Sequence, residues 1–261
     1  MACDLLEAGR LAEVFREVQP SAVVHAQALS DVDRCEREPA LAEAMNVEAT
    51  ANLLAAARAC EKPPNVVHLS TDYVFDGTKG APYAEDDPPR PLSVYGRSKL
   101  KAEVLVRGWP SALVVRTSTL FGDGRMNFCD HIVQCLREGR GVEVFSDQTT
   151  SPTWTDDLAA AIAELVAVIG RRPIAAWPSR VVHLANAGGC TRLDLARRVA
   201  ALTGGDERHI RPVRMADQQR PAPRPAYSAL TTTYGPQFIG RRLRGWEDAL
   251  IAYLRQRRWL S

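Results

Sequence analysis

A tyrosine and a lysine stand four residues apart in the stretch VYGRSKL, residues 94–100. In a helix, this spacing places the two side chains on one face. A phenol with an ordinary pKa of about 10 is a poor proton donor at neutral pH, whereas a neighbouring ammonium stabilises the phenolate and lowers that pKa. A lowered pKa suits general acid–base catalysis. We therefore predict that Lys99 lowers the pKa of Tyr95, which donates a proton to a carbonyl oxygen as hydride reaches the carbon.

Polar side chains precede this pair at the end of an expected strand. The stretch NVVHLS, residues 65–70, runs directly into TDYVFDG, so Ser70, Thr71 and Asp72 are expected at a carboxyl strand end. The Thr71 hydroxyl can share the hydrogen bond to the carbonyl oxygen and fix its orientation. Asp72 is expected either beside the substrate or as the cap of a turn. A tyrosine and a lysine at this spacing also occur by chance on surfaces, and the upstream strand end is what favours an active site.

The elements that must position these residues alternate along the chain. Short β-branched segments predict strands at residues 21–26, 65–70, 111–117 and 180–185. Helical patterns comprise one with Leu11, Val14, Phe15 and Val18, one over about residues 39–60, one beginning near Ser93, and one that Thr155 can cap. Apolar strands separated by helices indicate a parallel sheet covered on both faces. The predicted fold class is α/β with a doubly wound parallel sheet, which binds ligands at the carboxyl ends of its strands.

Two regions interrupt this alternation. Residues 123–150 and 188–261 are predicted to form a smaller lobe, and residues 1–122, joined by about 151–187, the main domain. Within the smaller lobe, residues 190–205 predict a helix that is closed by glycine. The proline-rich residues 214–229 are expected to form an ordered loop or linker.

Composition excludes several classes of protein. The hydrophobic fraction of 46% and charged fraction of 25% are those of an ordinary globular protein. A net charge of +2 gives no strong field toward nucleic acid or an anionic membrane, and no apolar run approaches the length of a membrane span. The six cysteines contain no CxxC pair, which favours reduced thiols in a cytoplasmic protein. No histidine pattern indicates a metal site, and His25, His68 and His183 are expected in or near the core.

The stretch HLSTDYVFDGTKGAPYAEDDPPRPLSVYGRSKLKAE, residues 68–103, resembles the extended short-chain dehydrogenase/reductase family, and within it the dTDP-4-dehydrorhamnose reductases. Further blocks follow in family order: VVHAQALSDVDRCEREPALAEAMNVEATANL, VVRTSTLFG, DQTTSPTWTDDLA and RPAPRPAYSAL. The likeness covers nearly the whole chain. It implies a Rossmann-type sheet, in which the main domain is the remainder of an NAD(P)-binding domain and the smaller lobe binds substrate.

The resemblance also implies roles for individual residues. The implied catalytic residues are Thr71, Tyr95 and Lys99, with Lys99 also holding the nicotinamide ribose. The implied cofactor-binding residues are Asp4 and Leu5 beside the adenine, Ala26, Gln27 and Ala28 in a small-residue loop, Leu69, Tyr95 and Lys99. The implied substrate-binding residues are Thr71, Asp72 and Thr119. Alternatives stay open for three of these positions and one more: Ala26 and Ala28 can be core alanines, Asp72 can cap a turn, and Asn46 can be a helix-packing amide or a catalytic one.

Two features depart from the family pattern. Thr119 stands where reductases of this branch often carry an aromatic residue, which puts the exact sugar in doubt. The glycine-rich turn that receives the pyrophosphate is also missing, since Gly9 is the only glycine before Gly77. We therefore expect an N-terminally truncated sheet in which residues 21–26 form an open edge. The sequence is then a shortened form of a longer reductase, a remnant without cofactor affinity, or a chain whose missing strands come from another polypeptide.

The leading hypothesis is an oxidoreductase that reduces the 4-keto group of a nucleotide-activated deoxysugar, with NADP or NAD as cofactor. The expected partner is the nucleotide-sugar substrate, with neither nucleic acid nor membrane, and a homodimer is left open. One alternative is a non-catalytic regulatory protein like the beta subunit of methionine adenosyltransferase. Another is a sibling epimerase or dehydratase, against which the blocks STDYVFDG and SPTWTDDLA favour the reductases.

Overall fold

The computed structural model describes residues 2–260. At its centre lies a parallel sheet with strand order β1-β2-β3-β8. The strands are β1 (Ala22–His25), β2 (Asn65–Thr71), β3 (Ala112–Thr117) and β8 (Val181–His183). The four expected strands and their parallel direction are confirmed. Within the described residues, β1 pairs only with β2 and forms one edge of the sheet.

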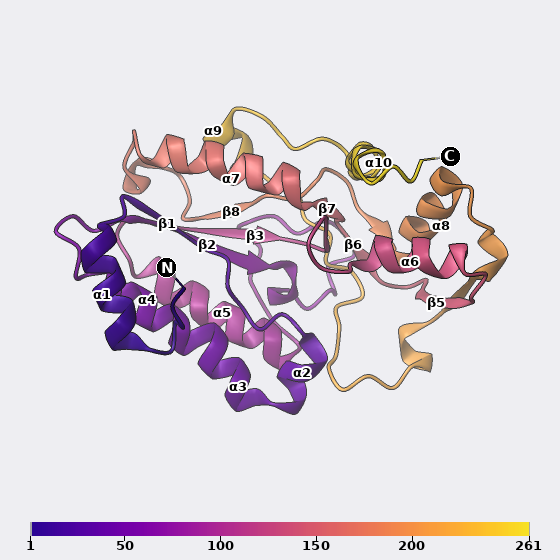
Figure 1. Ribbon diagram of the computed structural model, residues 1–261, viewed down its shortest axis with the longest axis horizontal. Helices are drawn as coiled ribbons and strands as arrows, with labels where there is room; N and C mark the ends of the chain where they lie inside the picture. The colour runs from indigo at the N-terminus through magenta and orange to yellow at the C-terminus, as the bar shows by residue number, and fades with distance from the viewer. Residues whose placement is uncertain (1, 261) are drawn as a thin grey trace.

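Helices cover both faces of the sheet (Figure 1). On one face lie α1 (Ala8–Val18), α4 (Ala49–Ala57) and α5 (Val94–Arg107), which meet Val66 and Val114 in one apolar cluster. On the other face lie α7 (Thr155–Ile169) and α9 (Gly235–Ile239), which meet Val67 and Val115 in a second cluster. Successive residues of one strand are thus buried on opposite faces, which is why the strands are apolar throughout.

The ends of two helices test the expected caps. Ser93 caps α5 as expected, because its hydroxyl accepts a hydrogen bond of 3.2 Å from the backbone N–H of Gly96. The expectation that Thr155 caps α7 is wrong. Thr155 is the first helical residue, and Trp154 occupies the cap position without a side-chain hydrogen bond. The short strand β7 (Thr153–Trp154) runs straight into the helix, so extended backbone ends one residue earlier than the sequence suggested.

The helix expected over residues 39–60 is present as continuous helical backbone over residues 39–57, with a π-helical turn inside it. After α2 (Val32–Arg37) come α3 (Pro39–Glu43), a π-helical turn η1 (Ala44–Glu48) and then α4. Asn46 lies in this turn, where its Oδ1 accepts from the backbone N–H of Leu29 at 2.7 Å. Its Nδ2 donates to the Ser98 hydroxyl at 2.9 Å. Asn46 therefore joins the loop after β1 to α5, which fits the packing role expected for it.

A second apolar core lies beside the sheet. It is built by α6 (Phe128–Arg137), α8 (Arg192–Thr203) and α10 (Trp246–Gln256) against β5 (Val142–Phe145) and β10 (Ile210–Val213). As expected, α8 is closed by a glycine, Gly204, in the left-handed conformation at φ 66°. Short strands β4 (Leu120–Phe121) and β6 (Thr149–Thr150) pair with β7 and β9 (Cys190–Thr191). The remaining short helical turns are η2 (Asp72–Val74), η3 (Ile174–Ala176), η4 (Glu207–His209) and η5 (Met215–Asp217).

Part of the segment expected in the smaller lobe packs elsewhere. Phe238 and Leu243 belong to the apolar cluster that α7 forms on the main sheet. The ring of Phe238 stacks on the ring of Trp177, with 4.3 Å between the two centroids. The domain boundaries stay a prediction.

Three further expectations concern thiols, histidines and membrane spans. All six cysteines are free thiols. His25, His68 and His183 are buried strand residues, as expected. Within residues 2–260, the structure has no helix with the length and apolar character needed to cross a bilayer.

Candidate active site

The carboxyl ends of β1, β2 and β3 open into a cavity of about 360 Å³. Its walls come from the segments that follow these three strands, together with α5 and one residue of α8. The lining residues include Ala26, Ala28, Leu69, Thr71, Asp72, Tyr73, Tyr95, Lys99, Thr117, Ser118, Thr119 and Arg192. This is where an α/β sheet of this class binds ligands.

Tyr95 and Thr71 are hydrogen-bonded partners in this cavity. Burial raises the pKa of Tyr95 above its ordinary value, and the Thr71 hydrogen bond opposes this only in part. The prediction that Lys99 lowers the pKa of Tyr95 is therefore wrong. Burial removes the water that would stabilise the phenolate, and the hydrogen bond with Thr71 does not compensate for this loss. The Lys99 ammonium donates to His68 and Leu69 instead.

Lys99 is 2% exposed, and its Nζ donates to the backbone oxygen of Leu69 at 2.7 Å. A second contact of 3.2 Å joins Nζ to Nε2 of His68. Burial lowers the pKa of Lys99 to about 8, against the attraction of the Glu103 carboxylate. The ammonium thus has two acceptors behind the cleft, while the side chain itself lines the cleft.

Asp72 ties the cleft floor to a distant loop. Its carboxylate accepts from the hydroxyls of Ser118 at 2.9 Å, Ser228 at 2.5 Å and Thr71 at 3.2 Å. Burial raises the pKa of Asp72, although these three donors oppose the shift. Asp72 lines the cleft and is the first residue of the turn η2, but the cap of that turn is Thr71, whose hydroxyl accepts from the backbone N–H of Tyr73 at 3.2 Å. The expected place of Asp72 beside the substrate stays a prediction.

Thr119 also lines the cleft, in a backbone conformation that is rare for its residue type. Its φ of 41° lies in the left-handed region, which β-branched residues seldom adopt. The backbone oxygen of Thr119 accepts from Thr153 at 3.0 Å, which helps to hold this conformation. Such strain is found where the surrounding structure fixes a functional loop.

Other expected site residues lie apart from the cleft. Asp4 is exposed, and its Oδ1 accepts from the N–H of Leu6 at 2.9 Å. Leu5 packs against the α1 and α4 cluster and accepts from Asn52 through its backbone oxygen. Gln27 does not line the cavity, but its buried Oε1 has no hydrogen-bond partner among the described residues.

Gly96 allows α5 to approach the turn after β2. A Cβ added at Gly96 would lie 2.2 Å from the backbone oxygen of Tyr73, and both segments are helical backbone that cannot move aside alone. We expect Gly96→Ala to destabilise the protein by about 1–3 kcal/mol and to displace Tyr95 from Thr71. Chemical denaturation measures the loss. Gly9→Ala in α1 is the control, because nothing lies within 4 Å of its added Cβ. Equal stability of the two variants would contradict this close approach.

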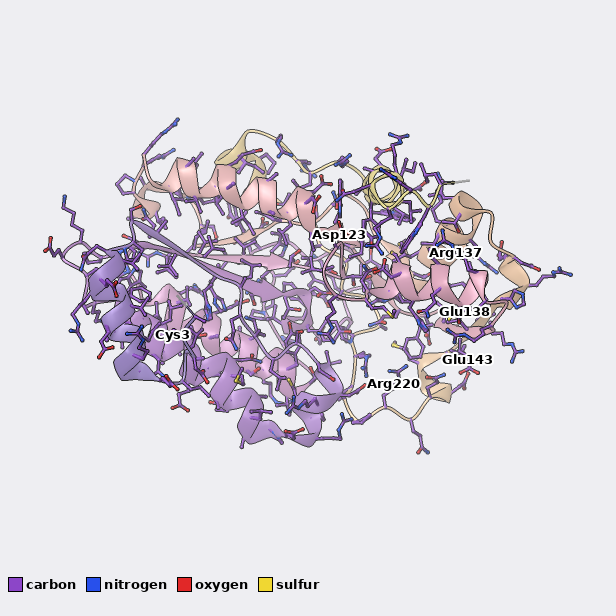
Figure 2. The ribbon with its side chains drawn as sticks, viewed as in Figure 1. Cys3, Asp123, Arg137, Glu138, Glu143 and Arg220 are labelled. Atoms are coloured by element: carbon purple, nitrogen blue, oxygen red, sulfur yellow. The ribbon has the colours of Figure 1, made fainter. Side chains whose placement is uncertain are left out.

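A second cavity of about 430 Å³ adjoins the first and shares Val32, Tyr73 and Arg192 with it. Its other walls include Phe128, Phe145 and two arginines of the proline-rich loop, Arg220 and Arg224. In Figure 2 Arg220 lies close to Glu143, another lining residue, on the side of the second core. The expected ordered loop thus forms a wall of this cavity.

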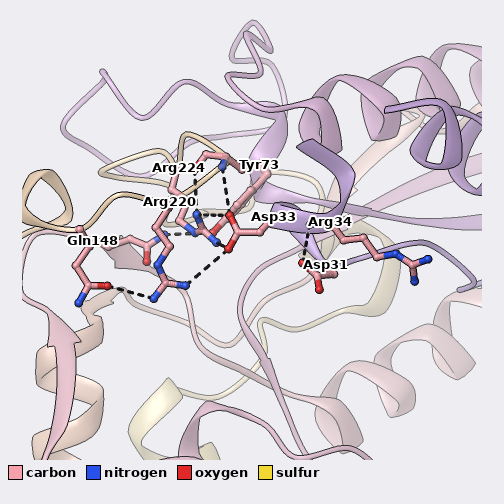
Figure 3. Close-up of polar contacts among 9 residues, drawn as sticks. Asp31, Asp33, Arg34, Tyr73, Gln148, Arg220 and Arg224 are labelled. Carbon is pink, nitrogen blue, oxygen red and sulfur yellow. Dashed lines mark hydrogen bonds and ion pairs between the residues drawn. The ribbon is translucent and has the colours of Figure 1, made fainter. Parts of the chain in front are cut away.

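Asp33 of α2 anchors this loop across the cleft. Figure 3 shows Arg220 and Arg224 converging on its carboxylate. The Arg224 guanidinium donates to both Asp33 oxygens at 3.1 and 2.8 Å, and the N–H of Ala222 adds a bond of 3.2 Å. These contacts lower the pKa of Asp33, against the effect of partial burial. Arg220 is more loosely held, at 3.7 Å from Asp33.

Sequence reasoning missed Tyr73, Ser118 and Arg192 as cleft residues. Tyr73 and Ser118 stand inside the quoted blocks STDYVFDG and VVRTSTLFG, so their position at strand ends was a usable signal. Arg192 follows β9 in the other part of the molecule. No local pattern indicates that it faces the ends of β2 and β3.

The family model described as the RmlD substrate binding domain matches residues 1–258. The chain belongs to this family. A probable dTDP-4,6-dihydroxy-2-methyloxan-3-one 4-ketoreductase of Streptomyces antibioticus is 37% identical over 248 residues, which cover 95% of this chain and 81% of that protein. A dTDP-4-dehydrorhamnose reductase of Mycobacterium tuberculosis is 39% identical over 239 residues, covering 89% of this chain and 75% of that protein.

Solved structures agree with this membership of the RmlD family. The dTDP-4-dehydrorhamnose reductase ortholog of Clostridium acetobutylicum superposes with a TM-score of 0.88 at 31% identity, covering 98% of this chain and 87% of that one. The dTDP-4-dehydrorhamnose reductase of Bacillus anthracis, solved in complex with NADP, gives a TM-score of 0.87 at 26% identity, covering 97% and 86%. The expected Rossmann-type fold is thereby confirmed.

Proposed function

We propose that this chain is an oxidoreductase that uses NADPH or NADH to reduce the 4-keto group of a nucleotide-activated deoxysugar, as a dTDP-4-dehydrorhamnose reductase does in dTDP-L-rhamnose biosynthesis. The observation that carries the proposal is the meeting of Thr71, Tyr95 and Lys99 in one cleft at the strand ends. The reductases among its relatives support it. They also disfavour the alternative of a regulatory binding protein.

The cleft fits the nicotinamide end of such a cofactor. Lys99 is a donor with three hydrogens, two of which go to His68 and Leu69, so that one stays for a ribose hydroxyl. The Thr117 hydroxyl in the cleft wall is buried and has no protein partner in the described chain. Small side chains at Ala26 and Ala28 leave room for a flat ring. When bound, the reduced cofactor supplies the hydride.

The residues of the chain then handle the proton. Tyr95 stays protonated through the neutral range because burial raises its pKa. The proton is therefore on the phenol when the carbonyl oxygen arrives, although the raised pKa also makes the phenol a weaker acid. Thr71, already hydrogen-bonded to Tyr95, is placed to orient the same oxygen. The Asp72 carboxylate holds Thr71 and Ser118 in place beside the sugar.

The adjoining cavity suits the nucleotide diphosphate. Arg192 lines both cavities. Its guanidinium lies 5.0 Å from the Phe128 ring, and no ion pair joins it to a carboxylate within the described residues. Arg220 and Arg224 line the same wall and share the Asp33 carboxylate, so the two arginines bring one net positive charge to it. A diphosphate here would bridge the keto sugar in the first cavity and a base near Phe128 or Phe145.

We expect Arg192→Ala to raise KM for the nucleotide sugar about 10- to 100-fold, with little change in kcat, because a charged hydrogen bond to phosphate is lost. Steady-state kinetics measures the effect. Arg197→Ala is a matched control on the same helix, since Arg197 pairs with Glu207 at the surface. An unchanged KM in the Arg192 variant would place the diphosphate elsewhere.

The proposed function is tested by cofactor consumption. Protein made from its full reading frame is mixed with NADPH or NADH and a dTDP-4-keto-6-deoxysugar, and the oxidation of the cofactor is followed by absorbance. Turnover that depends on the keto sugar is expected. Absence of turnover with either cofactor, in protein shown to be folded, would contradict the proposal.

We place this activity in the cytoplasm on the basis of the free thiols. A homodimer remains a prediction.

A further inference from the structure

The amine of Lys99 is held from behind the cleft by two successive residues of β2. Its Nζ lies 2.7 Å from the backbone oxygen of Leu69 and 3.2 Å from Nε2 of His68. His68 is 0% exposed and lies on the sheet face that α5 covers. The proposed function uses Lys99 but assigns nothing to this histidine.

The hydrogen bonds determine which nitrogen of His68 carries the proton. An ammonium group can only donate, so Nε2 of His68 must accept and a neutral ring must carry its hydrogen on Nδ1. Nδ1 is buried and has no hydrogen-bond partner among the described residues. Buried polar atoms without a partner are uncommon. This ring orientation leaves the buried Nδ1 unpaired, which costs free energy. The same orientation allows Nε2 to accept a hydrogen bond from Lys99.

A neighbouring histidine has the opposite arrangement. The Thr50 hydroxyl donates its one hydrogen to the backbone oxygen of Asn46 at 2.8 Å, so it must accept from Nε2 of His25 at 3.0 Å. His25 therefore carries its proton on Nε2. The rings of His25 and His68 are 4.9 Å apart on adjacent strands. His25 makes no hydrogen bond with Lys99, which makes it an internal reference for His68.

We propose that His68 is a positioning residue for Lys99: it accepts one ammonium hydrogen and, together with the Leu69 oxygen, directs the remaining N–H into the cleft. The inference rests on the proposed function for the use of that N–H, and on the contacts alone for the positioning. Because the acceptor favours the charged amine, His68 also keeps Lys99 protonated at higher pH than burial alone would allow.

Other ionisable groups surround this amine and must be separated from the effect of His68. Glu103 lies one turn further along α5 and favours the charged amine; its own charge is paired with Arg116 of β3. His25 of β1 is neutral at physiological pH, because burial and the charge of Lys99 lower its pKa to about 4. Tyr95 lines the same cleft as Lys99 and is neutral in the same range.

The natural protein provides the first test. Nitrogen-15 NMR of the imidazole rings reports the tautomer of each histidine. We expect His68 with its proton on Nδ1 and His25 with its proton on Nε2 across neutral pH. A His68 ring protonated on Nε2 would overturn the proposal, because that nitrogen could not then accept from the ammonium.

Variants provide the second test. The chain has only four lysines, Lys62, Lys79, Lys99 and Lys101, so carbon-13 labelling at Cε resolves the titration of Lys99. Its pKa is about 8 in the natural protein. We expect His68→Leu to lower that pKa by about one to two pH units, since an acceptor of a charged donor is lost. His68→Gln, which keeps an acceptor, should restore most of it, and His25→Leu should change it little.

The NMR titrations and the activity measurements together distinguish failure of the positioning role of His68 from failure of the proposed function. If the Lys99 pKa falls in His68→Leu only, the positioning role holds, and the alkaline fall of kcat/KM should move to lower pH with it. If the NMR titration shifts but no turnover exists in any variant, the proposed function fails and the positioning role stands. If His25→Leu or His68→Gln lowers the pKa as much as His68→Leu, repacking explains the shift and the proposal is overturned. Thermal unfolding verifies that each variant is folded.

Discussion

Tyr95→Phe is expected to reduce kcat about 10²- to 10⁴-fold, the usual contribution of a general acid. The phenol is hydrogen-bonded to Thr71 in the cleft, and its raised pKa keeps the proton on oxygen through the neutral range. Phenylalanine preserves the ring contact with Tyr73, which has an edge geometry at 5.9 Å between centroids. Stability should therefore change little while turnover is lost. Cofactor oxidation with saturating keto sugar measures the effect.

Tyr83→Phe is the matched control for this experiment. Like Tyr95, Tyr83 has a hydrogen-bonded hydroxyl, which donates to Asp76 at 2.8 Å, but Tyr83 lies outside the cleft. Its replacement should affect stability more than kcat. Unchanged turnover in Tyr95→Phe would remove this residue from the chemistry. Equal losses in both variants would indicate a structural effect instead.

Glu103→Ala is expected to destabilise the protein by about 3–5 kcal/mol, the effect of breaking a buried ion pair by removing one partner. The Glu103 carboxylate accepts two hydrogen bonds from Arg116, at 2.9 and 2.7 Å, and one from the Ser70 hydroxyl at 2.6 Å. The two side chains are 1% and 3% exposed. Without the carboxylate, the Arg116 charge remains buried between α5 and β3 with no counterion. Urea denaturation at neutral pH measures the loss.

A surface pair on the same helix gives the comparison. Lys101 contacts Glu43 at 2.9 Å, with side chains 59% and 49% exposed. Because water solvates both charges, Lys101→Ala should cost about 0–1 kcal/mol. A Glu103 variant that unfolds at the same urea concentration as the Lys101 variant would show that the buried pair adds no stability over its surroundings.

The Tyr95–Lys99 spacing shows how far a local pattern can be trusted. A spacing of four residues placed both side chains on one face of α5 and in one cavity, because helical geometry depends on neighbouring residues only. It could not indicate where the flexible lysine chain ends. The amine lies against Leu69 and His68 of β2, about thirty residues earlier in the chain. The expected pKa of Tyr95 had the wrong sign because burial, not the distance along the helix, dominates it.

The sequence by itself determined the strands, the main helices and the residues at the strand ends. Apolar β-branched runs such as residues 112–117 must be buried on both faces, so their order predicts a covered parallel sheet. What only the tertiary structure decided are the contacts between distant segments. Asp33 and Arg224 are 191 residues apart in the chain. Arg192, the residue that follows β9, lines a cleft formed mainly by the ends of strands far earlier in the sequence. Such pairs form because two cores pack against each other, and no periodicity along one segment encodes the position of another.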